Sequence, residues 1–568
     1  MAVAASTELA HLEQYIEDQL AAFHVPGVSL AVIKGDDILL LKGFGKRRLE
    51  GDLPMTENTV MPIGSTTKTF TSALLATLVD DGLIEWDKPV RDYLPDFRMY
   101  DPVATDNMTP RDLLCHRSGL PRHDMVWYGN KELTRADAVH RLRYLKPNKG
   151  FREVWQYNNL MFLTAGYLAE TLLGMSWEDA VRTRLLEPLG MSNTTFSVDE
   201  AQALPDHARP YVFKDEKNEE VPYRGIDLAG PAGSINAPLK DLARWAVVHA
   251  NKGSFEGKQI VSAAAVKQMH GAAMVMPEGG DYWPENTGIA YGLGWFINIY
   301  RGHRVLHHGG NIDGFSSMLT VIPEAGIAVV ALTNLHGTPL RDFLPLRIFD
   351  ELLGLEPLPW EARYLELFEG IRSGMKTAKE HRAATTQDAP TSHPLEAYAG
   401  RYTHPGYGVV TIRHQDGILV PEYNDNRIRM KHLQYDTFEL EVEPFDEGQG
   451  MRVRFETDFD GEVSVLRVPF EPSVDPIEMR REPDDSLKDE STLQRYAGEY
   501  SIGPVVATVT VDDHELYIEV AGQPRQKLIP KRARLFGSEA SEATVEFVEV
   551  EGKITSVVAG GVSLTRVE

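Results

Sequence analysis

The chain has 568 residues, too many for one hydrophobic core, and its 42% hydrophobic and 25% charged residues are typical of folded proteins, so two to four globular domains are expected and a largely disordered chain is excluded. The net charge of −25 makes nucleic acid and anionic membrane surfaces unfavourable partners. The single cysteine, Cys115, excludes an intrachain disulfide and a cysteine-rich metal site.

The N-terminal stretch is acidic and amphipathic, without the basic region and apolar run that mark a signal peptide. No run approaches the roughly 18 apolar residues of a membrane-spanning helix. These two patterns predict a soluble, cytoplasmic protein that does not bind membranes.

The first part of the chain combines strand and helix patterns. Apolar residues recur at helical spacing over 8–23, two strand-like runs flank a turn at 34–37, and a second helical pattern covers 65–81. Further helices are predicted over 134–145, 160–173, 238–251 and 339–353, and strands return between 291 and 334. An antiparallel sheet split between the two ends of this region, with helices inserted, is an α+β layout.

The second part of the chain has a different character. Residues 376–394 are polar, contain proline and show no period, which predicts a linker between a first domain, 1–375, and an all-β tail. The tail repeats Leu-x-x-Tyr-Ala-Gly-x-Tyr at 395–402 and 493–500. We predict two related small antiparallel barrels, 395–482 and 491–568. They are expected to cap the first domain or to build a homo-oligomer, ahead of enclosing a ligand cavity of their own.

The stretch "STTK" places Ser65 three residues before Lys68 at the start of a predicted helix. Positions i and i+3 share a helix face, so the amine of Lys68 can reach the hydroxyl of Ser65. A serine becomes a good nucleophile when a base removes its proton, and lysine serves as that base when burial or nearby positive charge lowers its pKa. Alone, this spacing often arises by chance, and a Ser/Thr-rich N-cap followed by a solvent-exposed lysine is then the favoured interpretation.

Two further stretches could complete a site. In "YNN", Tyr157 and Asn159 precede a predicted helix, where a phenol and an amide could face a cleft and a phenolate could relay a proton; the alternative is a tyrosine packed in the core. In "HHGGN", a strand runs into a predicted glycine-rich turn whose backbone can approach a ligand closely. His307 and His308 are otherwise surface histidines, because no third ligand at zinc-site spacing accompanies them.

With "STTK", "YNN" and "HGG" (308–310) in this order, the sequence resembles the serine β-lactamase and penicillin-binding protein superfamily, in its class C-like branch of esterases, D-aminopeptidases and related peptidases. "VPGVSLAVIKGD", "TPRDLLCHRSGLPRHD", "LLEPLGMSNTTF" and "YGLGW" are also similar, and the resemblance covers roughly 8–355. It implies an antiparallel sheet with helices on both faces and a helical subdomain. The tail resembles paired lipocalin-like barrels.

The resemblance also implies roles for individual residues. Ser65 would be the acyl-forming nucleophile, and Lys68 and Tyr157 would share its activation and protonate the leaving group, with the identity of the base left open. Asn159 would position Lys68 and substrate. The backbone N–H groups of Ser65 and Asn311 would form the oxyanion hole. His308, in the motif that ends at Gly310, would take the place of the lysine in Lys-Thr-Gly; this register puts Gly314 six positions on and is preferred over one that begins at His307.

The function predicted from this resemblance is a metal- and cofactor-independent serine hydrolase acting on small peptides or amides. A carboxylesterase of the same fold, acting on short acyl esters, is the second hypothesis, and a non-catalytic binding protein is the third. Penicillin destruction is disfavoured, because histidine at position 308 lacks the fixed positive charge that would hold a substrate carboxylate.

Overall fold

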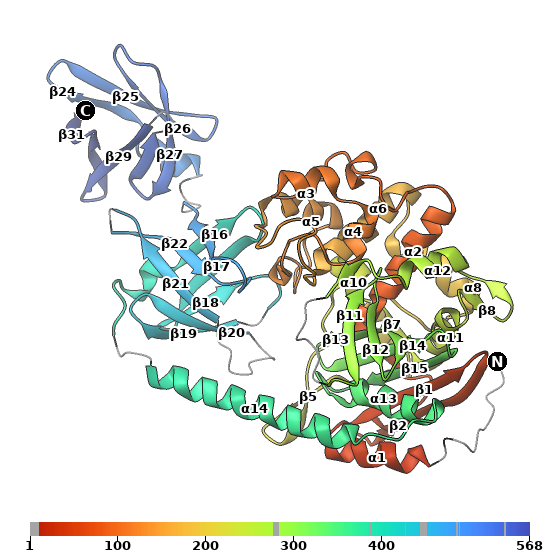
Figure 1. The fold of residues 1–568 in the computed structure, drawn as a ribbon. Coiled ribbons are helices and arrows are strands. Elements are labelled where there is room, and N and C mark those ends of the chain that lie inside the picture. The colour runs from red at the N-terminus through yellow and green to blue at the C-terminus, as the bar shows by residue number, and fades with distance from the viewer. Residues whose placement is uncertain are drawn as a thin grey trace.

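The computed structural model describes residues 9, 11–276, 283–385, 389–426, 428–442, 451–459, 461–483, 487, 489–538 and 541–567 (Figure 1). Three large sheets organise these residues: one of nine strands in the first part of the chain, and two of eight strands each in the tail. Among them, no helix combines the length and the apolar character needed to cross a membrane.

The nine-stranded sheet is antiparallel and joins both ends of the first region, in the order β10-β11-β12-β13-β14-β15-β1-β2-β3. Its strands are β1 (Gly27–Lys34), β2 (Asp37–Arg48), β3 (Leu53–Pro54), β10 (Met274–Val275), β11 (Asn286–Tyr291), β12 (Phe296–Tyr300), β13 (His303–Ile312), β14 (Phe315–Ile322) and β15 (Ile327–Thr333). The predicted hairpin is confirmed, since Lys34 pairs with Asp37. The run 291–300 is broken by a turn between β11 and β12.

Helices cover both faces of this sheet, as predicted. On one face, α1 (Leu12–Ala22) and α13 (Leu340–Leu352) pack on Val28, Leu30 and Val32 of β1; on the other, α2 (Thr67–Asp80) and α11 (Leu239–Ala250) pack on Ala31 and Ile33. Strands β14 and β15 are buried along their whole length, which explains the nearly continuous apolar sequence of β15 and the absence of charged residues from β14.

The remaining elements of the first region are short, apart from one helix. They are α3 (Pro102–Asn107), α4 (Pro110–Leu114), α5 (Arg135–Arg141), α6 (Asn159–Leu173), α7 (Trp177–Val181), α8 (Glu187–Leu189), α9 (Val198–Ala203), α10 (Gly230–Gly233) and α12 (Ala263–Met269), with the two-stranded pairs β4 (Val60–Pro62)/β7 (Asn236–Pro238), β5 (Tyr211–Lys214)/β6 (Lys217–Glu220) and β8 (Ser254–Phe255)/β9 (Lys258–Gln259). The helices predicted at 134–145, 160–173, 238–251 and 339–353 correspond to α5, α6, α11 and α13.

The predicted linker differs from the structure. Helix α14 (Trp360–Thr385) extends well into 376–394, where no apolar period was found. Its start is anchored by Trp360, which is buried, whereas residues 371–374 are exposed. Lysine, alanine, glutamate and arginine favour helix intrinsically, so a solvated helix needs no apolar stripe. The domain boundaries given above stay a prediction.

Two eight-stranded antiparallel sheets form the tail. The first consists of β16 (Gly400–His404), β17 (Gly408–Gln415), β18 (Ile418–Glu422), β19 (Ile428–Gln434), β20 (Thr437–Val442), β21 (Met451–Thr457), β22 (Val463–Val468) and β23 (Ile477–Arg481). After α15 (Glu490–Gln494), the second is a closed barrel of β24 (Gly498–Ile502), β25 (Val505–Asp512), β26 (Glu515–Val520), β27 (Gln526–Arg532), β28 (Leu535–Ser538), β29 (Ser541–Val550), β30 (Lys553–Ala559) and β31 (Val562–Arg566). In both, the repeat motif's last tyrosine hydroxyl donates to the carbonyl of its first tyrosine, at Tyr402–Tyr398 and Tyr500–Tyr496.

The first barrel lies against the helical part of the catalytic region, and the second lies farther away (Figure 1). The interior of the first barrel and the core around α2 and α6 belong to one continuous cluster of buried apolar side chains. The interior of the second barrel forms a separate cluster. The first barrel is therefore packed as an integral part of the catalytic region.

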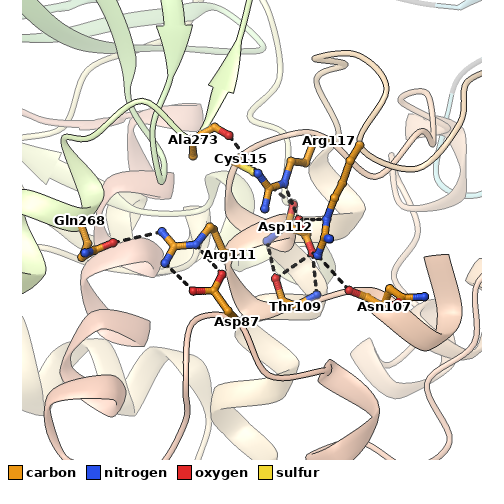
Figure 2. A network of polar contacts seen from close by, with 10 residues as sticks. Asp87, Asn107, Thr109, Arg111, Asp112, Cys115, Arg117, Gln268 and Ala273 are labelled. Carbon is orange, nitrogen blue, oxygen red and sulfur yellow. Dashed lines mark hydrogen bonds and ion pairs between the residues drawn. The ribbon is translucent and has the colours of Figure 1, made fainter. Parts of the chain in front are cut away.

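A buried carboxylate organises the helical subdomain (Figure 2). Asp112 has a fully buried side chain, caps α4 through Thr109 (Thr109 N–Oδ2 2.9 Å), and is paired with Arg117 and Arg152. Burial opposes its ionisation, but hydrogen bonds from Arg152 and the charge of Arg117 lower its pKa. Arg117 also donates to the carbonyl of Ala273, which ties α4 to β10.

Removing the Asp112 carboxylate leaves two arginines without their shared partner. We expect Asp112→Ala to lower the free energy of unfolding by about 3 kcal/mol or more, as for other broken buried ion pairs. The matched control is Asp87→Ala, which removes the exposed partner of neighbouring Arg111 and should cost under about 1 kcal/mol. Urea denaturation followed by tryptophan fluorescence measures both, and equal losses would contradict this ranking.

Candidate active site

The candidate nucleophile and its base lie where β4 leads into α2. Ser65 belongs to a 3-10 turn, Gly64–Thr66, and Lys68 lies in the first turn of α2. Their side chains meet, with 3.0 Å between Lys68 Nζ and Ser65 Oγ. Ser65 is partly exposed, whereas Lys68 is completely buried. The sequence pair is thus a contact between an accessible hydroxyl and a desolvated amine.

Two carbonyl groups fix the Lys68 amine. Nζ lies 2.7 Å from Oδ1 of Asn159 and 2.8 Å from the backbone oxygen of Ala232 in α10. Burial, together with the charge of Arg122, holds the pKa of Lys68 well below its usual range. Both carbonyls can only accept, so they take the two N–H groups of a neutral amine, and its lone pair is left facing Ser65.

Tyr157 lies beside the amine of Lys68. Its ring lies 4.9 Å from Lys68 Nζ and packs at 4.2 Å between centroids against His116. Burial raises the pKa of Tyr157, although a hydrogen bond with Ser65 and the charge of Arg122 act in the other direction. The phenol therefore stays protonated. His116 is itself fixed, because its Nδ1 accepts from the backbone N–H of Asn158 at 3.0 Å.

Asn159 is the first residue of α6 and connects Lys68 to a carboxylate. Its Nδ2 donates to Oδ1 of Asp124 at 3.0 Å, which fixes the amide so that its oxygen points at Lys68. Asp124 also accepts from Trp127 Nε1 (2.8 Å) and pairs with Arg122 (2.6 Å). The chain of contacts Asp124–Asn159–Lys68–Ser65 is continuous.

Strand β13 lies against the turn that carries Ser65. The expected glycine-rich turn is not formed at Gly309 and Gly310, which are inside β13 and pair with Met318 and Ser317 of β14. Glycine is required at position 310 for close packing and not for a turn, because a Cβ there would overlap the carbonyl of Ile63. One residue on, Asn311 N is 3.0 Å from the position a Cβ would take on Gly64, itself at φ +51°. The backbone of Asn311 thus lies close to that of Gly64, the residue before Ser65.

The two histidines of β13 point to opposite faces of the sheet, as strand alternation requires. His307 stacks on Phe296, whereas His308 is on the side of Lys68 and is buried. Nδ1 of His308 donates to the carbonyl of Gly309 (2.8 Å), and Nε2 accepts from Tyr291 (3.0 Å). Burial and the nearby Lys68 hold its pKa well below the usual range, so the imidazole is neutral.

Several residues of the site were not singled out from the sequence. Asp124, Arg122 and His116 fall inside "TPRDLLCHRSGLPRHD", and Tyr291 begins "YGLGW", both noted only as familiar stretches. The contacts from Asp124 to Asn159 and from His116 to Asn158 cross 35 and 42 residues, so no local spacing rule indicates these residues. Across the described part of the chain, no group of three or more histidine, cysteine or acidic side chains is arranged to hold a metal ion.

A cavity of about 850 Å³ lies beside α5, α6, α7 and α9, and its polar lining includes Lys131, Arg135, Glu170, Glu178, Asp199 and Asp227. Arg135 is paired with Glu170 and Glu178. A narrower cavity shares Asp227 and Val198 with it and continues to Gly233 and Ile312, beside the Gly64–Asn311 contact. The narrower cavity is therefore lined by residues next to the turn that carries Ser65 and next to Asn311.

Comparison with known proteins places this geometry in a family. The family model described as Beta-lactamase matches residues 12–353. A second model, described as a domain of unknown function (DUF3471), matches 384–483, which contains the first barrel. The chain therefore belongs to the Beta-lactamase family, and it is a serine hydrolase of the β-lactamase fold.

Three similar proteins illustrate the range of this family. Unguisins hydrolase ungD' of Aspergillus campestris is 32% identical over 417 residues, which cover 70% of this chain and 76% of that protein. D-amino acid amidase from Ochrobactrum anthropi, solved with L-phenylalanine amide, is 25% identical with a TM-score of 0.50 and covers 61% of this chain and 98% of its own. The octameric penicillin-binding protein homologue from Pyrococcus abyssi shares the fold, with a TM-score of 0.52, 21% identity, and coverage of 90% and 98%.

The close approach of β13 predicts the effect of adding one methyl group. We expect Gly310→Ala to slow labelling of the active-site serine by a fluorophosphonate more than tenfold, because β13 must move away from Ile63. Gly309→Ala is the matched control, since the nearest atom to its new Cβ is the flexible end of Met318 at 3.1 Å. Labelling rates come from intact-mass spectrometry over time. Equal rates for the two variants would show that the approach is not required.

Proposed function

We propose that the protein hydrolyses small peptides or amides through an acyl-enzyme on Ser65, with Lys68 as the base. The observation that carries this is the buried amine of Lys68, which is held by two acceptors and lies 3.0 Å from Ser65 Oγ. As Ser65 Oγ attacks the substrate carbonyl, its proton passes to Lys68 Nζ and the carbonyl oxygen becomes an oxyanion. The backbone N–H groups of Ser65 and Asn311 stabilise that charge.

Tyr157 acts as the proton donor to the leaving group. Its protonated phenol beside Lys68 suits a relay in which Tyr157 gives its proton to the departing nitrogen and regains one from the Lys68 ammonium. Water then attacks the acyl-enzyme, with the same groups acting in reverse. The raised pKa of Tyr157 favours Lys68 over a phenolate as the initial base.

The acidic side chains around Asp227, which lines the narrower cavity, support a substrate with a free amino group. Burial and the carboxylates of Glu178 and Asp199 raise the pKa of Asp227, as expected where negative charges gather. A cationic amine is favoured there, and the neutral His308 offers no fixed charge to a carboxylate. The similar protein named as a D-amino acid amidase agrees with cleavage of amide bonds.

The alternative is a carboxylesterase that uses the same Ser65 and Lys68. A panel of L- and D-aminoacyl amides, their N-acetylated forms and short acyl esters separates the two functions. Turnover of esters alone would favour the esterase. Turnover of amides that falls on N-acetylation supports the peptidase or amidase.

Ser65 is tested by covalent labelling. We expect one fluorophosphonate adduct per chain, lost in Ser65→Ala and slowed at least a hundredfold in Lys68→Ala and Tyr157→Phe, because activation of the hydroxyl is removed. Intact-mass spectrometry measures the adduct, and circular dichroism checks that each variant is folded. Ser72→Ala, on the same helix, is the control. An adduct that persists in Ser65→Ala would exclude Ser65 as the nucleophile.

The lowered pKa of Lys68 fixes the sign of the pH dependence. The neutral amine is the active form, so labelling should reach its full rate well below pH 10.5 and should fall as the pH drops through the lowered pKa of Lys68. A rate that instead rises with pH up to the ordinary lysine value of 10.5 would show that Lys68 is an ammonium at neutral pH. Initial labelling rates over a pH series, bounded by a stability check at each pH, measure this profile.

A further inference from the structure

The segment from Arg122 to Asn130 lies between the active site and the first barrel. On the active-site side, Asp124 holds Asn159, and the hydroxyl of Tyr128 donates to Asp313 at 2.9 Å, two residues beyond Asn311. One short segment therefore supports both the lysine arm of the site and the end of strand β13. Its conformation sets where those groups lie.

The opposite side of this segment is held by the barrel loop Tyr423–Asn426, which follows β18. The hydroxyl of Tyr423 donates to the carbonyl of Met125 at 2.8 Å. Nδ2 of Asn424 is 3.1 Å from the same carbonyl and 3.0 Å from that of Tyr128. The backbone N–H of Asp425 donates to the carbonyl of Gly129 at 2.7 Å. The barrel loop thus donates hydrogen bonds to three backbone carbonyls of the segment, those of Met125, Tyr128 and Gly129.

The fit at this contact is close. Gly129 has φ +69°, and a Cβ there would lie 2.8 Å from the side chain of Asn426. Arg224, whose partner Asp313 also binds Tyr128, extends Nη1 to the carbonyl of Asp425 at 3.3 Å. The loop therefore contacts both halves of the site's support.

His123 is the residue in which barrel contacts and active-site geometry meet. It is fully buried, precedes Asp124, and has φ +47°, a conformation that costs a non-glycine residue about 1 kcal/mol. Its backbone N–H donates to Glu471 at 2.9 Å, and its Nδ1 is 2.6 Å from the hydroxyl of Tyr407. Both partners belong to the first barrel.

The tautomer of His123 follows from its neighbours. Nε2 lies 2.9 Å from the carbonyl of Lys146, which can only accept, so Nε2 carries the proton and Nδ1 accepts from Tyr407. Burial lowers the pKa of His123, so the ring is neutral. Every nitrogen atom of His123 is therefore hydrogen-bonded, and two of these three bonds are to the barrel.

We propose that the first barrel is a positioning element of the active site, in which Tyr407, Glu471 and Asn424 hold the Arg122–Asn130 segment so that Asp124 keeps Asn159 and Lys68 aligned with Ser65. The inference rests on the proposed function of Ser65 and Lys68. It assigns to the barrel a catalytic consequence that capping or oligomer formation alone would not have.

The test is Tyr407→Phe, which removes the hydroxyl that is hydrogen-bonded to His123 Nδ1 and keeps the ring. Fluorophosphonate labelling of Ser65 should slow about tenfold at pH 7. Its acidic limb should also move to higher pH, because a loosened segment admits water and burial is the main cause of the low pKa of Lys68. Arg413→Ala is the matched control: it breaks an exposed ion pair with Glu422 in the same barrel and should leave both readouts unchanged.

A double-mutant cycle separates positioning from general destabilisation. If Tyr407 acts through Asp124, adding Tyr407→Phe to Asp124→Ala should slow labelling no further. Additive losses, or a Tyr407→Phe enzyme with the parent's rate and pH profile, would overturn the inference. Should Tyr407→Phe fail to fold, Asn424→Asp removes the two Nδ2 bonds to Met125 and Tyr128 and should give the same profile. A parent enzyme that is not labelled at all would overturn the proposed function and this inference with it.

Discussion

The site depends on keeping an uncharged amine buried against a hydroxyl. An isolated lysine in the interior is costly while it is charged, and the cost falls when it gives up its proton. Lys68 is completely buried, with Asn159 and Ala232 accepting its two N–H groups. The packing of α2 against α6 and α10 thus lowers the pKa of Lys68 by desolvation, and the proposed function uses the resulting neutral amine as its base.

Much of the surrounding structure keeps the acceptors of that amine in place. Asn159 begins α6 and is oriented by Asp124, and α10 brings Ala232 to the other side. Asp112, farther back, anchors the segment whose His116 packs on Tyr157. These groups are polar and buried, so their hydrogen bonds form only when the neighbouring groups are correctly placed. This interlocking explains why the helical subdomain is rich in buried charged and amide groups.

The sequence predicted those parts of the fold that depend on local pattern. Ser65 and Lys68 are three residues apart, and Tyr157 and Asn159 are two apart, so each pair could be recognised by spacing, and the order of the motifs joined them. The apolar periods of α6, α11 and α13 likewise predicted those helices to within about one or two residues. Helix α14 was missed in part because a solvated helix is stabilised by intrinsic propensity and leaves no apolar stripe.

Contacts between distant segments could not be predicted in this way. Asp124 meets Asn159 across 35 residues, and Tyr423 meets Met125 across 298, so only the folded chain reveals them. Gly310 was expected to serve a turn. Its actual role is to let two backbones touch inside a sheet, a requirement set by Ile63, more than 240 positions earlier.

The shared apolar cluster has a thermodynamic consequence. The interior of the first barrel is continuous with the core around α2 and α6, so unfolding of either one exposes apolar side chains of the other to water. The two should therefore unfold in one cooperative step. The second barrel has its own interior and can melt separately. The two barrels are therefore not equivalent in energy. The interior of the first is part of the hydrolase core, whereas the interior of the second is a separate core.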